Sequence, residues 1–450
     1  MSGDWFDDVW QASHDATSPA VSAAPRFLTF QQINGIEPPG DDMGVVPAAL
    51  ADILFPPDQD GVHNYALLDA ARIPSLPETL ETSRLDHVCL FRGASFEQMK
   101  PVAPWLVRLN DSGKFTRNLF RASTRPWHLW DKGAGIFIRS AAPLEELCAH
   151  LRRFTKVSDS AGKWVFFRFW DPLVAQIYFG GMADHPERIG QIFTTPSGQR
   201  IEMIVQTGPQ QMLRMTPSAV LPPSQPRRAV TFEAADMALL AEVSYRALSR
   251  QIAQWLAQEY PGDLADRSAT QMQAIGAHVV ATGRWLGLTM KQDFAFLAQM
   301  MMTSGGWFLH DGTLPAMHPL IAAGPAPRAG AMAAAYADLQ AQSPQAELLG
   351  QWSDLRGHLA ELPDDQVLTQ NRLHDLIQTF LPKTARQVPL ALASTRRRLK
   401  DFALLEEITE GRAMLLALLF GPRFFEDPFK PWAQSDPEAA IAAAWRILTE

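Results

Sequence analysis

The stretch that decides the fold is Gly162-Lys-Trp-Val-Phe-Phe-Arg-Phe-Trp-Asp-Pro172, an aromatic run that contains one arginine and ends on Asp-Pro. Successive side chains of a β-strand point to opposite faces. One face would carry Trp164, Phe166, Arg168 and Trp170, and the other would carry Val165, Phe167 and Phe169. Because both faces are apolar, the pattern predicts a central strand over Trp164–Trp170, buried on both sides in a sheet covered by helices.

Arg168 is the exception in this run. Burying a guanidinium without a partner is costly, so we expect Arg168 to meet a carboxylate. Asp171 follows three residues later, and Asp69 ends another predicted central strand. A buried ion pair of Arg168 with one of these two is the favoured interpretation, and an arginine that faces a ligand or a partner is the alternative.

The composition limits the class of protein. The chain has 450 residues, of which 47% are hydrophobic and 20% charged, as in soluble globular proteins. That length predicts roughly two to three domains. The formal net charge of −8 argues against a general nucleic-acid binder, which needs clustered lysines and arginines.

The compartment is predicted from the cysteines and the apolar segments. Cys89 and Cys148 are the 2 cysteines, and both fit small buried thiols in a reducing environment. No uncharged apolar stretch approaches the roughly eighteen residues of a membrane span. The chain does not open with a basic region followed by an apolar run. We therefore expect a cytoplasmic protein.

The pattern predicts an α+β fold of two lobes. Residues 1–62 are turn-rich and would form an N-terminal extension. Residues 63–207 alternate strand and helix patterns, which predicts an α/β lobe with a mixed sheet. Residues 208–230 are rich in proline and would form a linker, and residues 231–450 predict an all-helical lobe. Near the start of the chain, an aromatic and acidic segment from Asp4 to Trp10 would pack on the body of the protein, a partner-docking segment being the alternative.

The expected elements follow from hydrophobic periodicity. The expected strands are Tyr65–Asp69, His87–Phe91, Trp105–Leu109, Gly135–Arg139, Trp164–Trp170 and Ile201–Val205, and Pro143–Phe154 is an expected amphipathic helix. In the second lobe, the expected helices are 236–260, 268–286, 290–303, 331–342, 346–360, 366–381, 384–400, 402–420 and 437–449.

Two stretches of the helical lobe resemble one another. Gly305-Gly-Trp-Phe-Leu-His-Asp311 and Gly421-Pro-Arg-Phe-Phe-Glu-Asp427 each follow an apolar helix, and their Gly, Phe and Asp residues are each 116 positions apart. The glycine would end the helix at a left-handed cap, the phenylalanine would return to the core, and the aspartate would start the next turn. The pattern indicates a candidate internal repeat with units 236–330 and 346–450. A chance match of three identities is the alternative.

No catalytic or cofactor-binding motif is recognisable. The chain lacks the common nucleotide-binding, nucleophile-elbow and zinc-protease motifs, and its 11 histidines show no metal-ligand spacing. We therefore expect neither a metal nor a cofactor. His128 is more simply explained as a satisfied core or surface histidine than as a catalytic one. The aromatic surplus, 13 Trp and 25 Phe against 5 Tyr, offers candidate interface anchors at the lobe edges.

An ordered set of segments resembles a known family. In chain order they are Tyr65-Ala-Leu-Leu-Asp-Ala-Ala71, Leu90-Phe-Arg-Gly93, Ala103-Pro-Trp-Leu-Val-Arg-Leu109, Gly135-Ile-Phe-Ile-Arg-Ser140, Leu144–Arg153 and Phe167-Arg-Phe-Trp-Asp-Pro172. Together they resemble the core of the adaptor or chaperone proteins that load toxic effectors onto the spike of the bacterial type VI secretion system. The resemblance covers residues 64–205, and no single motif in it is diagnostic.

The resemblance implies a non-enzymatic, cytoplasmic adaptor. Its partners would be a cognate secreted effector and the spike protein, without a nucleic acid, a membrane or a cofactor. Two lobes joined by a linker would form a cleft for a partner segment. The candidate residues of such a partner-binding or structural cleft are Asp69, Trp105, Trp127, Trp130, Arg168, Trp170 and Asp171.

Two other functions are open at this point. A hydrolase-like enzyme would use Asp69, His128, Arg168 and Asp171 at strand ends, where α/β sheets collect active sites, although no nucleophile accompanies them. An immunity protein that neutralises a toxin is the third possibility, and such proteins are usually much smaller.

Overall fold

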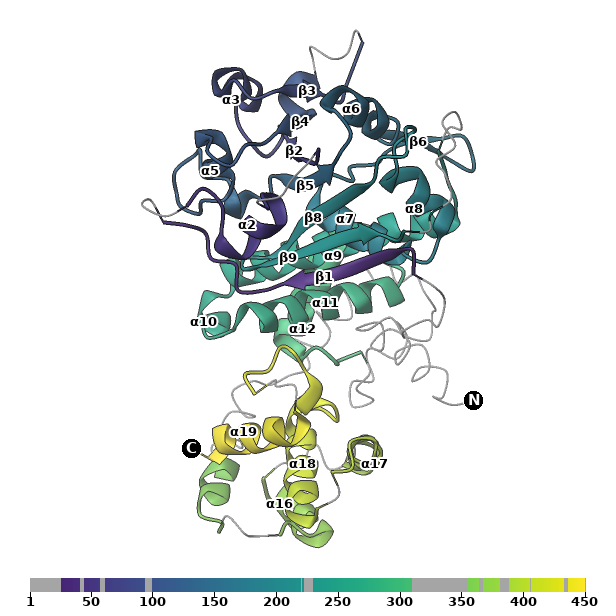
Figure 1. Cartoon of the computed structure of the whole chain (residues 1–450). Helices are drawn as coiled ribbons and strands as arrows, with labels where there is room; N and C mark the ends of the chain where they lie inside the picture. The colour runs from purple at the N-terminus through teal and green to yellow at the C-terminus, as the bar shows by residue number, and fades with distance from the viewer. Residues whose placement is uncertain are drawn as a thin grey trace. The chain divides into compact units, whose positions relative to one another are not determined.

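The structure is a computed structural model (Figure 1), and it describes residues 26–40, 44–56, 61–93, 99–219, 221, 230–309, 354–363, 367–380, 388–404, 406–432 and 436–449. The chain divides into two compact units, Met1–Ser244 and Tyr245–Glu450. The described part of the first unit holds two sheets and the helices that cover them, and that of the second is helical. The expected α+β fold of two lobes is therefore confirmed.

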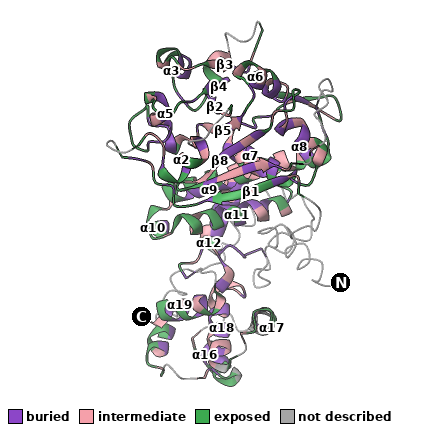
Figure 2. Ribbon diagram, in the orientation of Figure 1, coloured by how far each residue is buried: buried purple, intermediate pink, exposed green. Residues whose placement is uncertain are grey.

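A seven-stranded sheet forms the centre of the first unit. Its order is β1-β9-β8-β5-β2-β4-β3, and every neighbouring pair is antiparallel. The strands are β1 (Leu28–Ile33), β2 (His63–Asp69), β3 (His87–Cys89), β4 (Pro104–Arg108), β5 (Gly135–Ser140), β8 (Ile201–Gly208) and β9 (Gln211–Pro217). The edge strand β1 is largely exposed, whereas β2, between β5 and β4, is almost entirely buried (Figure 2).

Helices cover both faces of this sheet. Tyr65 and Leu67 of β2 point into one core, with side chains of α6 (Leu144–Arg152), α7 (Pro172–Gly181) and α8 (Pro186–Phe193). Ala66 and Leu68 point into a second core, with side chains of α2 (Ala48–Leu54), α3 (Leu76–Ser83) and α5 (Lys114–Leu119). The unbroken apolar run of β2 agrees with this burial on two sides.

A smaller sheet carries the aromatic stretch. Its order is β10-β6-β7, with β6 (Lys156–Asp159), β7 (Trp164–Phe166) and β10 (Thr231–Phe232). β7 pairs antiparallel with β6, and β10 pairs parallel with it, so the mixed pairing is found here. The predicted central strand over Trp164–Trp170 is wrong, because β7 is short and lies at the sheet edge. The chain leaves the sheet after Phe166 and turns into α7, which begins at Pro172.

The large sheet extends beyond the boundaries expected from the sequence. β1 lies inside the predicted N-terminal extension, 1–62, and pairs with β9, which lies inside the predicted linker, 208–230. Pro217 is the last residue of β9 and is opposite Leu28 of β1. The prolines that suggested a linker therefore flank a strand. The aromatic and acidic segment near the start of the chain lies outside the described residues.

The helical lobe also begins later than residue 231. β10 pairs with β6 across the proline-rich segment, and the first turn of α9 (Ala234–Glu259) contains a buried carboxylate, Asp236. Asp236 accepts hydrogen bonds from the Tyr178 hydroxyl at 2.6 Å and the Arg188 guanidinium at 2.7 Å. These contacts attach the start of α9 to the first unit, so the boundary falls inside α9, between Ser244 and Tyr245.

The second unit contains most of the expected helices. They are the second half of α9, α11 (Ala269–Trp285), α12 (Lys291–Ser304), α16 (Gln370–Phe380), α17 (Val388–Asp401), α18 (Glu407–Phe420) and α19 (Pro437–Thr449), and the short helix α10 (Pro261–Leu264) was not expected. One core is formed mainly by α9 to α12, and another by α16 to α19. The helix expected over 331–342 lies outside the described residues.

The two similar stretches end equivalent helical hairpins. In the first hairpin, α11 ends at Trp285 and α12 at Ser304; in the second, α17 ends at Asp401 and α18 at Phe420. The corresponding ends are again 116 positions apart. The loops inside the two hairpins share a positive φ at the same position, 72° at Gly287 and 56° at Ala403.

The glycine after each hairpin has the same conformation. Gly305 has φ 92° and ψ 153°, and Gly421 has φ 92° and ψ 157°. This is an extended backbone with positive φ, not the left-handed cap that we expected, and it is essentially restricted to glycine. Phe308 and Phe424 then return to the core, as expected. The wider units 236–330 and 346–450 stay a prediction, because residues 310–353 lie outside the described part.

Candidate functional site

Two reciprocal ion pairs join the end of β2 and the turn after it to the segment before α7. We call these four residues, Asp69, Arg72, Arg168 and Asp171, the arginine clasp. Asp69 Oδ2 accepts a hydrogen bond from the Arg168 guanidinium, and Asp171 Oδ2 accepts one from the Arg72 guanidinium. Each segment has one acid and one arginine three positions apart, in opposite order. Each segment therefore neutralises the charges of the other.

Main-chain donors fix the two carboxylates of the clasp. Asp69 is buried, and its Oδ1 accepts a hydrogen bond from Ala71 N at 3.0 Å. Asp171 is the N-cap of α7, and its Oδ1 accepts one from Leu173 N at 2.9 Å. That bond satisfies a main-chain donor of the first helical turn, which has no partner within the helix. Each of the two carboxylates thus accepts a hydrogen bond from a nearby main-chain N–H and another from an arginine.

The two arginines lie at the surface. The Arg168 side chain is 48% exposed and that of Arg72 is 38% exposed. Arg72 also donates to Gly133 O at 3.0 Å. Arg168 does pair with Asp69, one of the two predicted carboxylates, but the expectation of a buried guanidinium is wrong. In each pair of the clasp, the guanidinium group is therefore partly exposed to solvent and the carboxylate is the more buried partner.

β7 turns two large aromatic side chains to solvent. Trp164 is 59% exposed and Phe166 is 57% exposed, whereas Phe167 is fully buried. Lys156 Nζ lies 4.8 Å from the centroid of the Trp164 ring. The predicted alternation is present, but the face that carries Trp164, Phe166 and Arg168 is open. We call Lys156, Trp164, Phe166 and Arg168 the β7 face.

The four tryptophans expected at the site differ in exposure. Trp105, Trp130 and Trp170 are buried, and Trp130 Nε1 donates to Pro209 O at 2.8 Å. These three belong to the cores of the first unit. Trp127 is 53% exposed, so it is the one of the four that a partner could reach.

The residues of a hydrolase-like site do not form one hydrogen-bonded cluster. Within the described part of the chain, no hydrogen bond or ion pair of Asp69, Arg168 or Asp171 involves His128. His128 Nδ1 lies 2.7 Å from the Ser123 hydroxyl. Among the described residues, no group of three or more Asp, Glu, His or Cys could hold a metal ion.

The two thiols are buried, as expected. Burial raises the pKa of Cys89 to about 11 and also raises the pKa of Cys148. The Arg152 guanidinium donates to Cys89 O at 3.0 Å and lies 3.1 Å from Cys148 Sγ. Both thiols therefore stay protonated at neutral pH and serve as small core groups.

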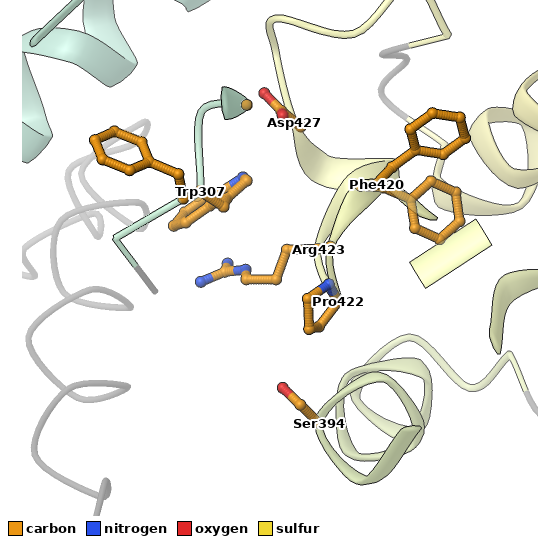
Figure 3. Close-up of a pocket in the computed structure, with 10 residues that line it drawn as sticks. Trp307, Ser394, Phe420, Pro422, Arg423 and Asp427 are labelled. Atoms are coloured by element: carbon orange, nitrogen blue, oxygen red, sulfur yellow. The ribbon is translucent and has the colours of Figure 1, made fainter. Parts of the chain in front are cut away.

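A small cavity in the helical unit is lined by residues of the two Gly-x-x-Phe turns (Figure 3). Its volume is about 30 Å³, which is room for a water molecule and not for a larger ligand. The Arg423 guanidinium carbon lies 3.5 Å from the centroid of the Trp307 ring, and Arg423 Nε donates to Glu426 at 2.8 Å. The cavity is therefore a packing feature.

Asp427 joins the two turns. Its carboxylate is buried and accepts hydrogen bonds from Gly306 N and Phe429 N, both at 2.9 Å. Burial raises the pKa of this carboxyl, and Lys430 and the two main-chain donors oppose the shift. Asp311, the equivalent residue of the first turn, lies outside the described residues. The bond from Phe429 N agrees with the expected turn at Asp427, whereas the bond from Gly306 N was not predicted by the sequence pattern.

One family model matches part of the chain. Residues 64–188 match the family described as "Domain of unknown function (DUF4123)". This range runs from β2 to the start of α8, so it contains the arginine clasp and the β7 face. No curated protein and no solved structure matches the chain. Among the described residues, none of the helices has the length and apolar character needed to span a membrane.

Proposed function

We propose that the chain is an adaptor, or chaperone, that binds a toxic effector and delivers it to the spike of a type VI secretion system. The segments that resemble such adaptors, from Tyr65 to Pro172, all lie inside the matched range, 64–188. The matched family is associated with type VI secretion effector adaptors. The resemblance and the family match thus concern the same residues of the same lobe.

The β7 face is the observation that carries the proposal. The apolar rings of Trp164 and Phe166 are exposed to solvent. Burying them against a partner would contribute favourable free energy of binding through the hydrophobic effect. Aromatic residues and arginine dominate the hot spots of protein interfaces. Lys156 and Arg168 beside the rings favour a partner surface that carries acidic residues.

The clasp gives this surface a fixed shape. Arg168 belongs to both, and its bond to the buried Asp69 limits where the guanidinium can lie. A group positioned before binding loses less conformational entropy when a partner arrives. We therefore propose stoichiometric binding without turnover, through a total interface of about 1,600 Å², the usual size for a stable specific complex.

Purification of the tagged chain from its source bacterium tests this function. We expect a toxin-domain protein to be retained in a fixed molar ratio, measured by light scattering and mass spectrometry, and the spike protein to be recruited with it. The Trp164→Ala/Phe166→Ala double variant should lose the toxin, while its melting temperature stays close to that of the wild type because both side chains are exposed. Met290→Ala is a matched control, because Met290 is 57% exposed in the helical unit.

Two results would contradict the adaptor function. One is a purified chain without a toxin or spike partner under conditions in which the secretion system is active. The other is turnover of a small molecule that is lost in Asp69→Asn or Asp171→Asn, which would favour the hydrolase-like alternative.

A further inference from the structure

The pairing of β6 with β7 shows which main-chain groups of β7 are engaged. Val157 is opposite Val165, Asp159 N donates to Lys163 O at 2.9 Å, and Phe167 N donates to Thr155 O at 3.1 Å. In an antiparallel pair, alternate residues of one strand direct their N–H and C=O groups to the neighbour. Residues 163, 165 and 167 therefore face β6.

The main-chain groups of Trp164 and Phe166 consequently point away from β6. Because β7 ends the order β10-β6-β7, no described strand lies on that side. An unpaired edge is a template for another strand, and proteins usually protect it with proline, inward-pointing charges or a covering element. β7 contains no proline, and two exposed aromatic side chains flank its free groups.

The charge around this edge indicates what would bind there. Lys156 and Arg168 lie on the β7 face, and Lys163 is exposed at the start of the strand. The turn also contains Asp159, whose Oδ1 accepts hydrogen bonds from Ala161 N at 2.9 Å and Lys163 N at 2.8 Å. Around this edge, three cations therefore stand against Asp159 and the Asp69 that pairs with Arg168, a small positive excess in a chain whose net charge is −8.

We propose that β7 binds an extended segment of the effector as an added strand. The segment pairs with the main-chain groups of Trp164 and Phe166. Every second side chain of the segment then lies on the β7 face, where apolar residues contact the two rings and an acidic residue approaches Lys156 or Arg168. This inference rests on the proposed adaptor function for the identity of the occupant. The pairing mode itself can be tested separately.

Amide hydrogen exchange resolved to single residues tests the pairing. In the free chain, the amides of Trp164 and Phe166 should exchange fast, while those of Val165 and Phe167 are already protected. Adding the co-purified toxin-domain protein should slow exchange at residues 164 and 166 specifically. Slow exchange confined to other surfaces of the lobe, with residues 164 and 166 unchanged, would overturn strand addition even if the adaptor function stands.

A proline variant separates the main chain from the side chain. Phe166→Ala removes the ring, and Phe166→Pro removes the ring and the outward N–H, which an edge strand tolerates. Phe166→Pro should weaken binding about tenfold beyond Phe166→Ala, because it also loses a main-chain hydrogen bond. Equal affinities of the two variants, at equal melting temperatures, would contradict the proposal.

A probe independent of the effector keeps the two proposals distinguishable. A phage library of random twelve-residue peptides, panned on the wild-type chain, should enrich peptides whose every second residue is apolar or acidic and that bind Phe166→Pro poorly. Failure to enrich such peptides overturns strand addition, whatever the co-purification shows.

Two other occupants would also overturn the proposal. If residues 164 and 166 are protected in the free chain and lose protection in Trp5→Ala/Phe6→Ala, the occupant is the N-terminal segment of the chain itself. If their protection rises with protein concentration, the occupant is a second copy.

Discussion

At the scale of single residues, the two arginines of the clasp differ in how deeply buried a carboxylate their removal would leave without its ion pair. Without Arg168, the Asp69 carboxylate would keep one main-chain hydrogen bond in a buried position. Without Arg72, the Asp171 carboxylate would keep its place as N-cap of α7, and its side chain is 14% exposed. The first carboxylate is therefore the more costly one to leave unpaired.

We predict that Arg168→Ala lowers the free energy of unfolding by about 2 kcal/mol and Arg72→Ala by about 1 kcal/mol. The first value is below the cost of breaking a fully buried pair, because water solvates the half-exposed guanidinium. Denaturant titration of the two variants and of Arg168→Ala/Asp69→Ala checks this difference. Equal losses in the two single variants would show that the burial of Asp69 does not decide the cost.

This site could be predicted in part from the sequence. The cost of an unpaired charge in an apolar run predicted a carboxylate partner for Arg168 and left Asp69 and Asp171 as alternatives, of which the structure selects Asp69. Arg72 was missed, although its signal is present in the reversed order of Asp69-x-x-Arg72 and Arg168-x-x-Asp171. The exposure of Trp164 and Phe166 was also missed, because periodicity assigns residues to faces and does not say whether another element covers a face.

At the scale of elements, a buried histidine couples α6 to α8. His150 is 1% exposed, and its Nε2 lies 2.9 Å from Ile192 O, so the neutral ring donates its proton to that carbonyl. The pKa of His150 is lowered to about 4, chiefly by burial and to a smaller extent by Arg153, while the hydrogen bond to Ile192 O and the Glu146 carboxylate oppose the shift. The folded chain thus binds a proton at this ring less readily than the unfolded chain.

The sign of the pH dependence follows from this depressed pKa. The contribution of His150 is complete above the unfolded pKa of about 6.5 and is lost as the pH falls toward about 4. We predict that the wild type loses about 3 kcal/mol more unfolding free energy than His150→Gln between pH 7 and pH 4. Glutamine can still donate to Ile192 O. Parallel pH profiles of the two proteins, from denaturant titrations, would contradict the prediction.

The glycine that ends α12 gives a second prediction at this scale. At Gly305, φ is 92° and an added Cβ would lie 3.0 Å from Asp427 Oδ2. Gly305→Ala should therefore destabilise the chain by about 1–3 kcal/mol. Gly180 in α7 is the control, because a Cβ there meets nothing within 4 Å, and Gly180→Ala should stabilise by up to about 1 kcal/mol. The same sign for both variants in denaturant unfolding would be evidence against the strained turn.

At the scale of the whole molecule, element types were easier to predict than boundaries. The strands from β2 to β5 and the helices of the second unit have strong periodicity, and the structure contains them. β1 and β9 were missed because prolines lie near them and because each is stabilised mainly by its long-range pairing with the other. The start of the helical lobe was misplaced for a similar reason, since the Tyr178–Asp236–Arg188 contacts join segments far apart in the sequence.

The central claim is that the chain acts by binding an effector for secretion, and the most direct measurement is effector secretion from a strain that lacks the chain. The account predicts that the deletion abolishes the toxin in the culture supernatant while secretion of the tube protein continues. Wild-type chain and Met290→Ala should restore toxin secretion, and Trp164→Ala/Phe166→Ala should not. Normal secretion of every toxin in the deletion strain would contradict the claim.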